Sequence, residues 1–277
     1  MNWKQTLFWS FSAAAIFYYF LLFGVFVFVG QEEMQLFIPE WWYIREFLFQ
    51  PGGFCAVAGQ WIIQYYRQPM SAVVFHTVLL VGCGFMVYRI LRCFSDKTYL
   101  LFLSLLPVLY LVKMSIHGEY LVDGTVGVVL MLLALSVSLK VRRAGSIAGY
   151  GIASTLFLCG LTGFLSVCYA FLYTLLALLR YKTSRQRLAA SACLIPALFI
   201  YLFSGWLGIP VPLSDGWMPE AYLEIQRLPH YYMYRVWTFF TLSIVGVALF
   251  ARFVPVIGEK SKWMDRVALV VCLITVL

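Results

Sequence analysis

The chain has 277 residues, of which 63% are hydrophobic and only 12% are charged, and its formal net charge is +8. A soluble domain carries about 25% charged residues and needs a polar exterior, so this composition excludes an ordinary soluble protein. Lys and Arg collect in the cytoplasmic loops of membrane proteins, which accounts for the positive charge without nucleic-acid binding. The lipid bilayer is therefore the predicted partner, and nucleic acid is not.

Eight apolar segments approach the ~20 residues that a membrane-spanning helix needs. They lie at about 7–29, 70–90, 98–114, 120–139, 146–162, 164–179, 188–205 and 235–251. A ninth begins near Val267 and reaches only 11 residues at Leu277, which predicts the N-terminal part of a longer protein. The predicted fold is an all-α polytopic transmembrane helix bundle over residues 1–277, a single domain with about eight complete spans and a truncated ninth.

The stretch 146–179 holds 34 residues without a charge, enough for one very long helix or for a hairpin of two short ones. Gly160-Leu-Thr-Gly163 lies at its middle, and basic residues flank both of its ends. Two flanks of the same charge belong on the same side of the membrane, so we predict the hairpin.

The distribution of charge predicts the orientation. Fifteen of the 20 Lys and Arg residues fall in the predicted inner segments, and nine of the 12 acidic residues fall in the outer ones. We therefore expect a bacterial inner-membrane protein with its N-terminus in the cytoplasm.

The first predicted outer loop, about 30–69, holds two helical patterns. Trp41, Ile44 and Leu48 recur at helical spacing and indicate an interfacial helix, which Pro51-Gly52-Gly53 ends. In the second pattern, Gln60, Gln64 and Arg67 form one polar stripe on an apolar helix. The stripe either faces water or lines a polar cavity that binds an anionic group.

The second predicted outer loop, about 206–234, resembles the first. Pro219 is well placed to begin an interfacial helix, and Pro229 to end it. Tyrosines that follow it are typical of an aromatic anchor for the next span.

Candidate site residues lie in the predicted outer segments. The sequence contains no standard catalytic or cofactor motif, and it does not indicate which cofactor, if any, the protein binds. The catalytic candidates are four glutamates, each of which is also an ordinary residue for an outer helix end: Glu32, Glu33, Glu40 and Glu46. The binding candidates are the polar stripe and two further clusters, namely His117, Glu119 and Asp123 in a short turn, and Asp215, His230 and Arg235 in the second loop.

Two features inside the apolar segments have structural interpretations. Seven cysteines are dispersed singly and are interpreted as small core hydrophobes, so no metal site is predicted. His76 is expected to be neutral and bonded to a backbone carbonyl, and the scarcity of other ionisable groups there weighs against an ion-coupled transporter.

Several short motifs resemble the opening of a bacterial family of multi-pass inner-membrane proteins that carries a domain-of-unknown-function label. They are Gln35-Leu-Phe37, Tyr43, Pro51-Gly-Gly53, Gln64-Tyr-Tyr66, Pro69 and Leu105-Leu-Pro107. The resemblance covers roughly the first half of the chain and implies further spans, but no activity.

The architecture also resembles, more weakly, the multi-pass polyprenyl-phosphate-sugar glycosyltransferases. These enzymes have an acidic residue in the first outer loop, which the four glutamates would match. That resemblance implies a polyprenyl-linked lipid as substrate, with a glutamate as base and Arg67 or Arg235 holding phosphate.

Three functions therefore stay open. The first is a membrane protein of unknown activity that serves as an envelope scaffold or assembly component. The second is a lipid-linked-sugar glycosyltransferase with its site on the outer face, and the third is a transporter or flippase.

Overall fold

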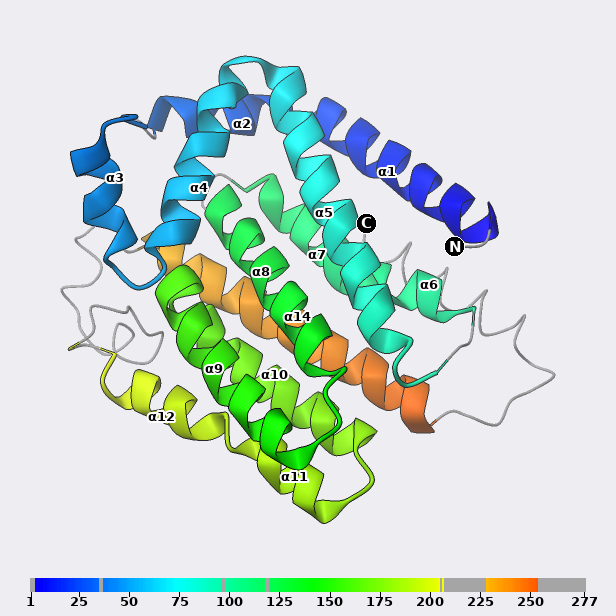
Figure 1. The fold of residues 1–277 in the computed structure, drawn as a ribbon. Coiled ribbons are helices and arrows are strands. Elements are labelled where there is room, and N and C mark those ends of the chain that lie inside the picture. The colour runs from blue at the N-terminus through cyan, green and yellow to red at the C-terminus, as the bar shows by residue number, and fades with distance from the viewer. Residues whose placement is uncertain are drawn as a thin grey trace.

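A computed structural model describes residues 3–34, 37–95, 98–117, 120–204, 206 and 228–253, with the side chains of 34, 228–235 and 253 left out. This described part of the chain is helical and contains no strand (Figure 1). Its helices are α1 (Trp3–Phe23), α2 (Val25–Met34), α3 (Trp41–Leu48), α4 (Gly53–Ile63), the 3₁₀ helix η1 (Gln64–Arg67), α5 (Pro69–Leu91), α6 (Leu100–Leu103), α7 (Leu105–Ser115), α8 (Val122–Ser138), α9 (Ala144–Thr162), α10 (Leu165–Arg180), α11 (Ser184–Ser191), α12 (Leu194–Leu202) and α14 (Leu228–Phe253).

Each of the eight predicted spans coincides with a helix or with two consecutive helices. Three helices, α1, α5 and α9, are long and apolar enough to cross a membrane, and several shorter ones are apolar. The all-helical, membrane-compatible fold is thus confirmed, while the number of spans stays a prediction. The last helix, α14, begins at Leu228, before the expected start of the span at 235.

Prolines account for two of the breaks between consecutive helices. Pro107 is the third residue of α7 and Pro196 the third residue of α12. A proline has no N–H to bond the carbonyl four residues earlier and clashes with that carbonyl. The helix axis is therefore interrupted just before each of them, at Ser104 and at residues 192–193.

The predicted hairpin at 146–179 is confirmed. Helices α9 and α10 are joined at Gly163, whose φ of 60° and ψ of −123° place it in a region that only glycine enters readily. The α9–α10 pair is among the most extensive helix contacts in the molecule.

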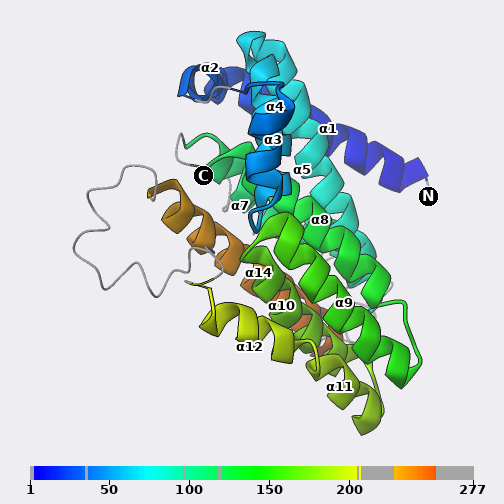
Figure 2. The same ribbon diagram turned by 60° about the vertical axis from the view of Figure 1, so that its left-hand side comes forward.

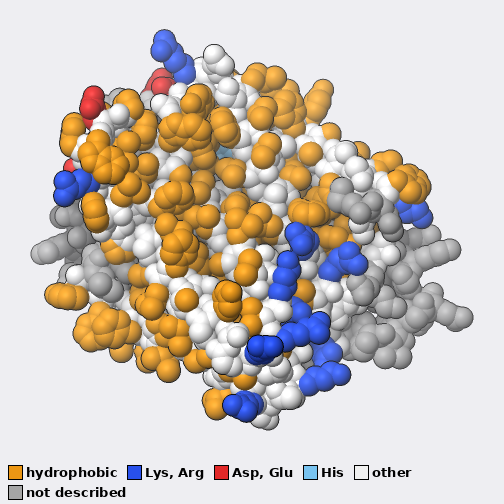
Figure 3. Space-filling view, in the orientation of Figure 1, with side chains coloured by type: hydrophobic (Ala, Val, Ile, Leu, Met, Phe, Trp, Pro, Cys, Tyr) orange, Lys and Arg blue, Asp and Glu red, His pale blue; other side chains and the backbone are white. Residues whose placement is uncertain are grey.

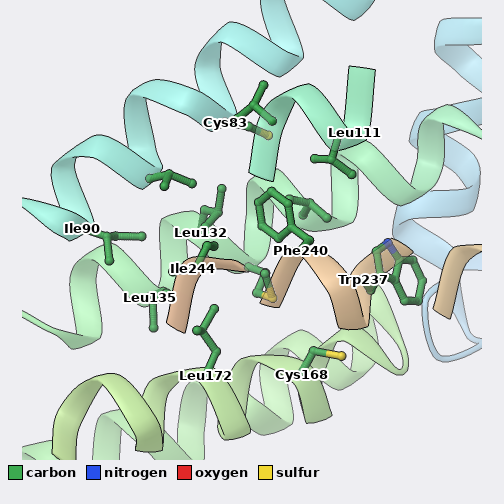
Figure 4. Packing of buried hydrophobic residues seen from close by; sticks show 14 of the residues in the cluster. Cys83, Ile90, Leu111, Leu132, Leu135, Cys168, Leu172, Trp237, Phe240 and Ile244 are labelled. Carbon is green, nitrogen blue, oxygen red and sulfur yellow. The ribbon is translucent and has the colours of Figure 1, made fainter. Parts of the chain in front are cut away.

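The bundle is arranged around α5, α8 and α10. Helix α1 packs on α5, α5 on α8, and α8 on α9 and α10, while α11 and α12 cover the far side of α9 and α10 (Figures 1 and 2). In the view of Figure 1, helix α14 crosses behind α8, and it packs on α7 and α10. Figure 4 shows its Phe240 and Ile244 directed into the core, between Leu111 of α7 and Leu172 of α10.

The face shown in Figure 3 is largely apolar between two charged ends. Hydrophobic side chains cover much of the middle of this face. Large exposed ones, such as Phe11 of α1 and Leu156 and Phe157 of α9, suit lipid as their solvent. Lys and Arg side chains concentrate at one end, called here the basic end, where α8 joins α9 and α10 joins α11. The visible Asp and Glu side chains lie at the opposite, acidic end.

The backbone at Gly163 provides a test of the hairpin. The Gly163→Ala variant would force a side chain into a mirror-image backbone conformation, and we expect it to lower the free energy of unfolding by about 1–3 kcal/mol. Gly149→Ala, in open space on α9, is the matched control and should raise stability by about 0.5–1 kcal/mol. Thermal unfolding in mild detergent measures both, and equal behaviour of the two variants would contradict the assigned turn.

Candidate functional site

The segment predicted as the first outer loop contains a helical hairpin, α3–α4, whose turn docks on the turn between α9 and α10. Gly52, with a φ of 85°, donates its N–H to the Gly160 carbonyl at 3.1 Å. A Cβ on Gly52 would lie only 3.4 Å from the backbone nitrogen of Gly163. The two glycine motifs that the sequence marks as separate turns therefore form one contact.

The hairpin itself closes tightly because Gly53 has no side chain. A Cβ on Gly53 would collide with the carbonyl oxygen of Phe47, in the last turn of α3. The N–H of Gln50 also bonds that carbonyl, at 2.9 Å, and the Gln50 carbonyl accepts from Gly53. Helix α3 thus folds back along α4, and Pro51-Gly52-Gly53 ends one helix and turns the chain as predicted.

Two more glycines hold α4 against α8. A Cβ on Gly59 would lie 2.6 Å from the Cβ of Asp123, in the first turn of α8. One turn further, Gly127 of α8 lies against Cys55 of α4 and Leu165 of α10. Small residues at helix crossings let backbones approach closely in a membrane, which is the physical basis of this contact.

The predicted polar stripe on α4 is divided by the fold. Gln60 accepts a hydrogen bond from the Tyr43 hydroxyl of α3 at 3.1 Å, so it ties the two helices of the hairpin together. Gln64 and Arg67 lie on η1 and are exposed.

Helix α3 is the most exposed element of this region, since none of its residues is buried. Trp41 and Trp42 are 67% and 61% exposed, and Phe49 just beyond the helix is 80% exposed. Together with Arg45 and Glu46 they line an open hollow on the surface.

The candidate glutamates lie on the surface of the acidic end. Glu32 is partly buried, whereas Glu33, Glu40 and Glu46 are exposed. Among the described residues, no group of three or more His, Cys, Asp and Glu side chains could hold a metal ion.

The other candidate clusters are only partly described. His117 is exposed, and the Asp123 carboxylate accepts the N–H of Gly124 at the start of α8. Glu119 and Asp215 fall outside the described residues. His230 and Arg235 belong to the first turns of α14, but their side chains are not described.

A buried histidine–tyrosine pair, which the sequence does not reveal, lies near this end of the bundle. Nε2 of His76 on α5 is 2.7 Å from the Tyr66 hydroxyl of η1. The Phe28 ring stacks on the imidazole with the ring centroids 4.3 Å apart, and Phe20 packs beside it. The histidine is fully buried, and its partner is a hydroxyl rather than the expected backbone carbonyl.

A second buried polar contact joins α2 to the start of α8. The Gln31 side chain donates to the backbone carbonyl of Tyr120 at 3.0 Å, and the hydroxyl of Thr125 donates to that of Tyr120 at 3.3 Å. The Gln31–Tyr120 contact has no local sequence signal, because the two residues are 89 positions apart.

These features define a class: a helical membrane-type protein with an apolar belt, a basic end, and an acidic end that carries a docked hairpin. The chain belongs to a family of unknown function, DUF6057, whose profile matches residues 1–273. No curated protein and no solved structure matches it. The resemblance to an uncharacterised family is therefore confirmed and extends over nearly the whole chain, whereas the likeness to glycosyltransferases is not supported.

The His76–Tyr66 contact yields a stability prediction. Tyr66→Phe leaves a fully buried imidazole nitrogen without its partner, and we expect the free energy of unfolding to fall by about 0.6–2 kcal/mol. The neighbouring Tyr65 is 42% exposed, so Tyr65→Phe is the matched control and should change little. Unfolding by denaturing detergent measures both variants, and unchanged stability of Tyr66→Phe would show that the contact contributes nothing.

Proposed function

We propose that this protein is a scaffold or assembly component of a bacterial inner membrane, and that its α3–α4 hairpin binds a partner protein at the outer membrane surface. In this proposal the basic end and the N-terminus lie in the cytoplasm, as the positive-inside rule favours. The observation that carries the proposal is a helix with no buried residue, α3, held on a hairpin whose turn is fixed by glycine contacts.

The hairpin is suited to recognition because its turn is docked on the bundle and α3 has no buried residue. Gly53 lets α3 fold directly back on α4, and the Gly52 N–H bonds the Gly160 carbonyl of α9. The exposed surface of α3 combines Trp41, Trp42 and Arg45, the residue types that dominate binding energy at protein interfaces. The same aromatic residues also suit the membrane–water boundary, so the partner would be a protein that lies at that level.

The transferase and transporter hypotheses have less support from the described residues. The four glutamates lie on the surface, and Gln64 and Arg67 of the polar stripe are exposed rather than directed into the bundle. The Tyr43–Gln60 bond uses the remaining member of the stripe within the hairpin.

A site-specific photo-crosslinker tests the proposal. A benzoylphenylalanine at Trp42, expressed in the native membrane, should give one protein adduct of defined mass. The same residue at Phe157 of α9, which is 68% exposed, is the matched lipid-facing control and should give none. Lipid adducts alone at both positions would contradict the proposal.

A second variant separates loss of binding from loss of folding. Because α3 has no buried residue, Trp41→Ala with Trp42→Ala should leave the thermal unfolding temperature almost unchanged. The partner identified by mass spectrometry, when tagged, should retrieve the wild-type chain and fail to retrieve this double variant. Equal retrieval of both would show that α3 is not the binding element.

A further inference from the structure

Two connections at the basic end are tied together by hydrogen bonds from side chains to backbone. The Tyr181 hydroxyl, after α10, donates to the Val141 carbonyl, after α8, at 2.7 Å. The side-chain amide of Gln186 on α11 donates to the Arg142 carbonyl, also at 2.7 Å. Burial raises the pKa of Tyr181, so this hydroxyl keeps its proton and remains a donor. The two connections therefore form one fixed surface.

This surface is strongly and uniformly basic. Its charged side chains, called here the basic seat, are Lys140, Arg142, Arg143, Arg180, Lys182, Arg185 and Arg187. The sequence has no Asp or Glu between Asp123 and Asp215, and the acidic residues that the structure describes belong to the opposite end of the bundle. Like charges held together in this way repel one another, so the seat favours an anion that neutralises them.

Two details add to the positive potential of this surface. Arg180 is a partly exposed residue at the end of α10, and its Nη1 has no hydrogen-bond partner among the described residues. Helix α9 begins at Ala144 without a side-chain cap, so its first backbone N–H groups and the positive end of its dipole also face this end.

We infer that the basic seat binds the phosphate headgroup of an anionic phospholipid. Arg180 ends an apolar helix, and the seat therefore lies at the depth where headgroups meet the hydrocarbon core. Apolar side chains continue beside it, since Leu188 of α11 is 75% exposed and Ile195 of α12 is 72% exposed. A phospholipid matches both parts, with its phosphate on the arginines and its acyl chains along α11 and α12.

Native mass spectrometry of the full chain tests this inference. The protein is released from nanodiscs made of equal parts phosphatidylcholine and phosphatidylglycerol, and the retained lipids are counted. We expect the wild-type chain to retain phosphatidylglycerol in preference to phosphatidylcholine. In the Arg143→Gln/Lys182→Gln variant, which removes two exposed charges, the preference should fall by about tenfold or more.

The matched control is the Arg45→Gln/Arg67→Gln variant, which removes the same charge from exposed positions at the acidic end. It should keep the wild-type preference. Equal loss in both double variants, or no preference in the wild-type chain, would overturn the inference. A further variant is Arg180→Gln, which should lose the preference for phosphatidylglycerol and unfold at a temperature close to that of the wild type. If this variant kept the preference, that result would also count against the site.

Discussion

The structure depends on one constraint, the high cost of unpaired backbone groups and of charge in hydrocarbon. A backbone in lipid must satisfy its own hydrogen bonds, and the described chain does so with helices alone. Charged side chains concentrate at the two ends of the bundle, while phenylalanines and leucines face outward between them. Some polar side chains inside the bundle, such as those of His76 and Gln31, form hydrogen bonds to specific partners.

Glycine residues allow close contacts between segments that are far apart in the sequence. The contact of Gly52 with Gly163 joins the first outer loop to a turn more than a hundred residues later, and Gly59 brings α4 against α8. These contacts leave α3 as a helix that the bundle supports but does not cover. The partner binding that we propose for α3 and the lipid binding that we infer at the basic end both involve surfaces that the core leaves exposed.

The sequence predicts much of this fold, because span length, helix-ending residues and charge alternation are local properties. The turn at Gly163, the turn at Pro51-Gly52-Gly53 and the position of α5 could all be predicted in this way. The contact between the two turns and the Tyr66–His76 bond could not, since each depends on how distant helices pack. For the same reason the polar stripe suggests a single surface, whereas Gln60 bonds Tyr43 and Gln64 faces outward.

The central claim is that the acidic and basic ends lie on opposite sides of one membrane. In a cysteine-free background, the Glu46→Cys and Arg185→Cys variants place a thiol at an exposed position at each end. We predict that a membrane-impermeant maleimide labels the Glu46→Cys variant in intact cells and the Arg185→Cys variant only after permeabilisation. Labelling of both variants from the same side would contradict the account.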